Sequence, residues 1–302
     1  MTRVATMPVQ RTLADALQRG QQQLAESQLD LATRKKVRDY AGLGTETVRN
    51  LSARTLIARH EAFGTVGTML GTTLQIYDAN LVEIGNTVST MRTEILTAIG
   101  TGRAPGLQES VEQAFRQFRA SLNASEGGQP LFGGSRTDTP PFAPTDLAAT
   151  LGLTPATAFM NDQVRASARV AEGVDVEHGL LASDFGSEMF EAFRTLAEAG
   201  SIGSVPTPAQ MAKLNDAIGL IDTGLGALRN VSAKTGRRQV QVEKLALRAE
   251  ERTLLLNDII SRSEDADLGK VANDIAQRKT TLEASYAVFA QLSQLSLAAY
   301  LR

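Results

Sequence analysis

The sequence of 302 residues contains no cysteine and no tryptophan, and only two of its residues are histidine. The absence of cysteine excludes disulfide bonds and thiolate metal sites. Aromatic residues make up 5% of the chain, a share that is low for a compact enzyme and common in helical rods, whose seams are filled by aliphatic side chains. These absences favour a helical structural protein over an enzyme.

Long apolar runs and an excess of positive charge are also missing. No stretch of 18 apolar residues is present, so we expect no membrane insertion. Residues 2–23 lack the apolar core and the small-residue cleavage site of a secretory signal, so we expect no cleaved signal peptide. The formal net charge is -2, which argues against a broad basic face for nucleic acid. The expected partners are therefore proteins.

The side chains needed for catalysis are scarce. Only His60 and His178 could act as acid-base groups or imidazole ligands at neutral pH, and the two do not form a pair at metal-ligand spacing. His60 lies on the apolar seam of a predicted helix, where a histidine usually serves packing. His178 lies beside a predicted hairpin, where we expect it to be exposed. We therefore predict no enzymatic activity, no catalytic residues, no cofactor and no metal.

Proline divides the sequence into three parts, because seven of the nine prolines lie between residues 130 and 208. Proline interrupts helices and central strands, so this middle block is predicted to be irregular, while both flanks can form long helices. The pattern predicts a mainly α fold, a long antiparallel helical bundle with terminal coiled-coil helices and an inserted small α+β domain. The predicted domains are residues 1–42 with 261–302 (terminal assembly), 43–135 with 207–260 (helical rod) and 136–206 (outer α+β domain).

The rod is predicted from two long apolar seams. Residues 56–98 carry apolar side chains at intervals of seven, with a second set four positions later, namely Leu56, Phe63, Leu70, Leu74, Tyr77, Leu81, Ile84, Val88, Met91, Ile95 and Ala98. Such a helix would be about 64 Å long at 1.5 Å per residue. A second seam predicts a helix over residues 207–260, which can lie antiparallel to the first.

Within the middle block, apolar side chains alternate with other residues over 164–176. Glu172-Gly173 interrupts this alternation, so we predict a hairpin. Apolar side chains at helical spacing then predict a helix from Phe185 to Leu196.

Both chain ends carry thin apolar stripes at helical spacing. Such a stripe cannot form a core alone, and isolated helices are marginally stable in water. An uncovered apolar chain end is unusual, so we expect the two helices to pair with each other and with neighbouring copies. The predicted assembly interface consists of Leu13, Leu17, Leu24, Leu31, Leu268, Val271, Ile275, Leu282, Phe289, Leu292, Leu295 and Leu301.

Four short segments allow a second interpretation. Residues 42–45 (GLGT) and 133–135 (GGS) are rich in glycine, but neither matches a phosphate-binding loop, so we interpret both as turns. The basic run over residues 34–38 could touch nucleic acid, although a solvated corner between helices fits the acidic balance better. Glu264, Asp265 and Asp267 lack the ligand spacing of an EF-hand, and we expect Asp265 and Asp267 in the first turn of the next helix.

Residues 129–142, QPLFGGSRTDTPPF, resemble the segment that leads into the outer domain of the flagellar hook-filament junction proteins, the third hook-associated proteins of the bacterial flagellin superfamily. The end of the chain resembles the same family at residues 263–267 (SEDAD), 282–285 (LEAS), 295–297 (LSL) and 300–301 (YL). The family usually carries a Ser/Thr-Gly pair near the end of its first segment, where this sequence has Thr33-Arg34.

The resemblance implies a structural subunit of the bacterial flagellum. Such a protein is exported unfolded by the type III apparatus without a cleaved signal, and it acts outside the cell as an adaptor between hook and filament. Its terminal helices would line the inner tube. Its implied partners are copies of itself, a hook-side adaptor, the filament flagellin and an export chaperone.

Two alternatives remain open at the level of sequence. A filament-forming flagellin with a small outer domain would carry the same terminal helices and differ mainly in copy number. A coiled-coil type III secretion translocator or chaperone would also have amphipathic ends and no cysteine, but it has no reason to carry residues 129–142 in this form.

Overall fold

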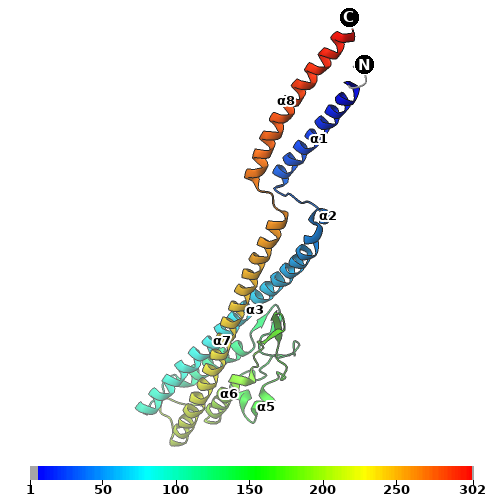
Figure 1. The fold of residues 1–302 in the computed structure, drawn as a ribbon. Coiled ribbons are helices and arrows are strands. Elements are labelled where there is room, and N and C mark those ends of the chain that lie inside the picture. The colour runs from blue at the N-terminus through cyan, green and yellow to red at the C-terminus, as the bar shows by residue number, and fades with distance from the viewer. Residues whose placement is uncertain (1–5, 301–302) are drawn as a thin grey trace. The chain divides into compact units, whose positions relative to one another are not determined.

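The protein is described by a computed structural model that covers residues 6–300, and it is built mainly from long helices (Figure 1). The elements in chain order are α1 (Thr6–Thr33), α2 (Tyr40–Leu43), a 3-10 turn (Gly44–Glu46), α3 (Thr47–Thr101), α4 (Leu107–Leu122), β1 (Ser125–Glu126), β2 (Gln129–Pro130), a 3-10 turn (Ala148–Thr150), α5 (Pro155–Ala158), β3 (Ser167–Ala171), β4 (Val174–Glu177), α6 (Ser183–Glu198), α7 (Pro208–Glu264) and α8 (Leu268–Tyr300). The predicted mainly α fold with a small α+β part is confirmed. No helix in the described range is both long and apolar enough to cross a membrane.

The chain forms two compact units. The terminal unit consists of residues 1–58 and 252–302, and the central unit consists of residues 59–251. The terminal unit thus contains α1, α2, the beginning of α3, the end of α7 and α8, while all strands belong to the central unit. The finer division into three domains stays a prediction.

Helix α3 includes the whole predicted stretch 56–98 and extends it at both ends. Its predicted seam is buried from Leu70 to Ala98, and Leu74, Ile84 and Val88 are completely shielded from solvent. The helix ends at Thr101, and Gly102 follows with a φ of 67°, a left-handed conformation that favours glycine.

Helix α7 packs antiparallel to α3 in the central unit. Ser232 Oγ donates to Asp78 Oδ1 at 3.1 Å, while Arg92 Nε lies 2.5 Å from Asp222 Oδ1, so the residue numbers fall in α7 as they rise in α3. The antiparallel pairing of the two long helices predicted from their seams is therefore present.

The middle block shares its core with the rod helices. Six of the ten phenylalanines form one cluster of contacting rings, which joins α4 and α6 to the loops between β2 and β3. Phe132 and Phe185 form a second cluster with Tyr77 of α3. Both clusters belong to the single buried core that contains the seam residues of α3 and α7. Most phenylalanines are thus concentrated where the bundle meets the irregular segment, and the buried seams of α3 and α7 are mainly aliphatic.

The predicted hairpin is formed by β3 and β4, which pair antiparallel from Ser167 opposite Glu177 to Ala171 opposite Val174. Gly173 occupies the turn with a φ of 67°. Helix α6 follows, and the phenylalanines predicted on its inner face are buried.

The glycine-rich loop at residues 133–135 is a turn around a carboxylate. Ser135 N donates to Asp162 Oδ1 at 3.0 Å and Val164 N donates to the same atom at 2.9 Å. Gly134 has a φ of 71°, and a Cβ there would lie 2.1 Å from Asp162 Oδ1. Hydrogen bonds from Ser135 and Val164 lower the pKa of Asp162. The loop therefore binds an anion of its own chain, which supports the interpretation as a turn.

A close approach between α6 and α7 allows a test of the packing in the central unit. A Cβ on Gly224 would lie 2.7 Å from Met189 Cγ and 3.2 Å from Met189 N. Gly224→Ala should lower the free energy of unfolding by about 2 kcal/mol, because the backbone of α6 would have to shift. The control is Gly219→Ala on the same helix, where a Cβ meets nothing within 4 Å. Gly219→Ala should instead raise the free energy of unfolding, measured in urea, by about 0.5–1 kcal/mol.

If Gly224→Ala and Gly219→Ala changed the free energy of unfolding equally, the close packing of α6 against α7 would be contradicted.

Candidate assembly interface

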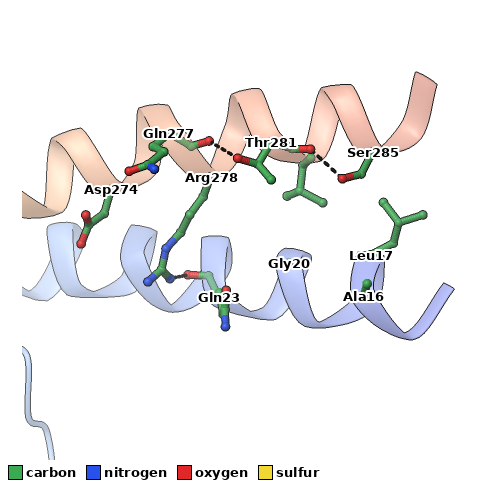
Figure 2. Close-up of a pocket in the computed structure, with 10 residues that line it drawn as sticks. Ala16, Leu17, Gly20, Gln23, Asp274, Gln277, Arg278, Thr281 and Ser285 are labelled. Atoms are coloured by element: carbon green, nitrogen blue, oxygen red, sulfur yellow. Dashed lines mark hydrogen bonds between the residues drawn. The ribbon is translucent and has the colours of Figure 1, made fainter. Parts of the chain in front are cut away.

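The main helix pair of the terminal unit is formed by α1 and α8, which run side by side (Figure 1). Leu282 packs over Gly20, where a Cβ would lie 3.2 Å from Leu282 Cδ2. The Arg278 guanidinium donates to the backbone carbonyl of Gln23, as Figure 2 shows. The predicted pairing of the terminal helices is therefore present within one chain.

Pairing buries little of the predicted apolar stripe. Leu282 is buried, with 8% of its surface exposed, whereas Leu31 and Leu268 are each 42% exposed. The remaining predicted residues with described side chains are half-buried, namely Leu13, Leu17, Leu24, Val271, Ile275 and Phe289. The side chains of Leu292 and Leu295, and all of Leu301, lie outside the described residues. One chain thus covers the described part of its own interface only in part.

Further apolar side chains of the helix pair face solvent and were missed in the sequence. Leu29 is 48% exposed, Tyr286 is 45% exposed and Val288 is 48% exposed. They lie off the predicted stripes, so the heptad pattern did not mark them. Tyr286 also accepts a hydrogen bond from the side-chain amide of Gln21, which ties its ring to α1. Together with the stripes, these residues make the helix pair apolar on more than one side.

A groove of about 360 Å³ runs between α1 and α8 (Figure 2). Ala16, Leu17 and Gly20 line it from α1, and Thr281 and Ser285 line it from α8. The hydroxyls of Thr281 and Ser285 donate to backbone carbonyls of their own helix, so they need no external partner. Small residues and satisfied hydroxyls form a surface suited to the close approach of another helix.

A buried carboxylate joins the first and last parts of the terminal unit, and we call this group the Glu264 clasp. The Glu264 side chain is 7% exposed and accepts from Lys35 Nζ at 2.7 Å, Arg54 Nη2 at 2.6 Å and Asn50 Nδ2 at 2.8 Å. Lys36 N also donates to the Glu264 carbonyl at 2.8 Å. The clasp connects the segment after α1, the beginning of α3 and the end of α7.

The electrostatics of the clasp favour the charged form of the carboxylate. Burial alone would raise the pKa of Glu264, but hydrogen bonds from Lys35, Arg54 and Asn50 outweigh it and hold the pKa at about 2. The hydrogen bond between Arg54 and Glu264 also raises the pKa of Arg54. The sequence had indicated a solvated corner at residues 34–38. Lys35 departs from this expectation, because it forms an ion pair with the buried Glu264.

The backbone beside the clasp has one unusual conformation. Arg34 has a φ of 58°, the left-handed region that favours glycine, and its carbonyl accepts from Ala266 N at 3.0 Å. This is the position where the resembling family usually carries glycine. The turn that follows α1 thus has a conformation suited to glycine, although arginine occupies the position.

The acidic segment before α8 has a capping role. Asp267 Oδ1 accepts from Gly269 N at 3.0 Å and from Lys270 N at 3.1 Å, as a helix N-cap does. Asp265 instead accepts from the hydroxyl of Ser261, and Glu264 belongs to the clasp. Among the residues that the structure describes, no group of three His, Asp or Glu side chains could hold a metal ion.

The two histidines differ in their environments. His60 is half-buried on α3, and its ring contacts Phe63 edge-on with 6.4 Å between centroids, which fits a packing role. His178 was expected to be exposed, and that expectation is wrong. It is half-buried beside the hairpin, and burial lowers its pKa. Arg238 of α7 reaches Glu177 of the hairpin at 3.4 Å, and its charge also lowers the pKa of His178.

Comparison with known proteins supports the fold. No protein-family model matches the sequence, and no curated protein matches it. A solved structure described as a putative flagellar hook-associated protein from Vibrio parahaemolyticus superposes with a TM-score of 0.62 at 16% identity, covering 72% of this chain and 96% of that one. The crystal structure of Bacillus cereus FlgL superposes with a TM-score of 0.57 at 13% identity, covering 69% and 98%. At these identities the likeness establishes a shared fold.

The clasp predicts a specific dependence of stability on pH. The pKa of Glu264 falls from an ordinary 4.5 to about 2 on folding, so its contribution is complete above about pH 5 and is lost as the pH falls toward 2. Glu264→Gln should lower the free energy of unfolding by about 2 kcal/mol at pH 7, because two cations lose their charged partner. This difference from the wild type should shrink steadily below pH 5 in urea unfolding.

Glu26→Gln, on the exposed surface of α1, is the control and should change stability little at any pH. A cost of Glu264→Gln that stays constant from pH 7 to pH 3 would contradict the account of the clasp.

Proposed function

We propose that this protein is a structural subunit of the bacterial flagellum, which joins the hook to the filament and assembles through its paired terminal helices. The observation that carries the proposal is the α1–α8 pair, which leaves Leu29, Leu31 and Val288 open to solvent in the single chain. A protein described as a putative flagellar hook-associated protein shares the fold, and so does Bacillus cereus FlgL. The resemblance of residues 129–142 and 263–267 to the junction proteins supports the choice within the flagellum.

The proposed mechanism is assembly driven by burial of apolar surface. Complete burial of a fully exposed leucine or valine contributes roughly 1.5–3 kcal/mol, and each of these half-exposed side chains contributes about 1 kcal/mol when a neighbouring copy covers it. A helix pair that is marginal alone becomes stable when neighbours complete its core. Export in an unfolded form through the type III apparatus fits a chain without disulfide bonds.

The partners of this proposal are copies of the same chain, a hook-side adaptor, the filament flagellin and an export chaperone. The location is the flagellum outside the cell. A filament-forming flagellin remains the main alternative. It differs in copy number, since an adaptor forms a short layer and a flagellin forms thousands of stacked copies.

The junction role is tested by deleting the gene from the source bacterium. Electron microscopy should show hooks without attached filaments, and complementation with the wild-type gene should restore them. Long filaments that remain attached to the hook in the deletion strain would contradict the junction role. Hooks that keep their adaptor proteins but lose most of the filament would favour the alternative, a filament-forming flagellin.

The assembly mechanism is tested by placing charge on the open face of the helix pair. Leu29→Asp with Val288→Asp should abolish sedimenting polymer at neutral pH, because a neighbour would have to bury both carboxylates. The helical content of the single chain should stay unchanged, since both side chains are largely exposed. Val205→Asp is the matched control in the central unit, where Val205 is 71% exposed. Normal polymer from the double variant would contradict the mechanism.

A further inference from the structure

The central unit carries a basic groove. This cavity of about 700 Å³ lies between the beginning of β4 and the outer face of α7. Val174, Val240 and Leu245 form its apolar part, and Arg237, Lys244 and Arg248 supply its charge. Val240 is 49% exposed although it lies in a groove, so apolar surface remains open there.

The three cations of the basic groove have no partner of their own. Arg237, Lys244 and Arg248 are exposed, and none makes an ion pair within the part of the chain that the structure describes. Carboxylates on the adjoining hairpin are already engaged, because Asp175 pairs with Arg169 at 2.8 Å and Glu177 pairs with Arg238 at 3.4 Å. The groove therefore presents an uncompensated positive charge next to open apolar surface.

A second groove of the same unit has the opposite charge. It lies between α3 and α4, has a volume of about 380 Å³, and contains the carboxylates of Glu83 and Glu94 but no cation. Glu83 accepts from Gln117 Nε2 at 3.0 Å, while Glu94 makes no ion pair with any described residue. Thr87 and Thr90 lie between the two carboxylates.

The charges of the two grooves are spaced alike. Arg237 and Arg248 are eleven residues apart on α7, and Glu83 and Glu94 are eleven residues apart on α3. Eleven residues make about three helical turns, so each pair lies on one helix face with its backbone positions about 16.5 Å apart. Two such faces can form both ion pairs at once when the helices are laid against each other.

We propose that the basic groove of one copy receives the acidic groove of a second copy of this chain. Arg237 and Arg248 meet Glu83 and Glu94, and Lys244 with Val240 covers the threonines between them. The contact joins two different surfaces, so it is heterologous and leaves one groove free at each end to continue a ring or a helical polymer. The inference rests on the proposed self-assembly and adds to it a contact in the central unit that sets the partner's orientation by charge.

The test compares charge-reversed full-length chains by sedimentation at low and high salt. Arg237→Glu with Arg248→Glu should weaken association by about tenfold or more at low salt, and Glu83→Lys with Glu94→Lys should do the same. The chain that carries all four substitutions should regain association, because the charges are again opposite. A mixture of the two double variants should associate more strongly than either variant alone. Arg103→Glu with Arg229→Glu changes the charge equally outside both grooves and should have little effect.

The proposal fails if the basic-groove variant associates like the wild type, or if the fourfold variant is not restored. It also fails if the wild-type chain stays monomeric at all concentrations. The terminal helices are tested separately, since Leu29→Asp with Val288→Asp should still show weak, salt-sensitive pairing through the grooves. One pair of results would support the terminal-helix mechanism and contradict the groove contact. In that case Leu29→Asp with Val288→Asp shows no pairing, and Arg237→Glu with Arg248→Glu forms as much polymer as the wild type.

Discussion

The two helices α1 and α8 do not bury their apolar stripes against each other, and the terminal unit depends on this constraint. In the α1–α8 pair, Leu282 is the one buried member of the predicted interface among the described side chains. The other members are half-buried or exposed, and Leu29, Tyr286 and Val288 add further open surface. A helix pair with so much open apolar surface gains stability when something covers it. On the proposed function, assembly and folding of the terminal helices are parts of one process.

The two units use different means to hold long helices together. In the central unit, the seams of α3 and α7 are continuous with a cluster of phenylalanines, so apolar burial determines how the helices pack. In the terminal unit, the Glu264 clasp adds a buried ion pair and backbone hydrogen bonds at the two places where the helical chain is interrupted. The hydrogen bonds and ion pairs of the clasp are directional, so they can determine which segments of the terminal unit meet. They do so without covering the apolar faces of α1 and α8.

Features that depend on periodicity could be predicted from the sequence, and features that depend on long-range pairing could not. The spacing of Leu74, Ile84 and Val88 predicted α3, and Glu172-Gly173 predicted the hairpin, because both are local signals. No signal in the sequence indicated the role of Glu264, since its partner Lys35 is 229 positions away. His178 was misjudged for a similar reason, because burial in the folded chain and the charge of Arg238, which lies 60 positions away, lower its pKa. The apolar stripes of α1 and α8 were visible, but their degree of exposure needed the structure.

The central claim is that neighbouring copies cover the open face of the α1–α8 pair, and the chain's lack of cysteine allows a direct measurement. A single cysteine at Val288 and, separately, at Val205 would be labelled with a maleimide in the monomer and in the assembled polymer. Both positions are exposed in the single chain, at 48% and 71%. The account predicts that the cysteine at position 288 is protected at least about tenfold in the polymer while the cysteine at position 205 stays reactive. Equal reactivity of position 288 in monomer and polymer would contradict it.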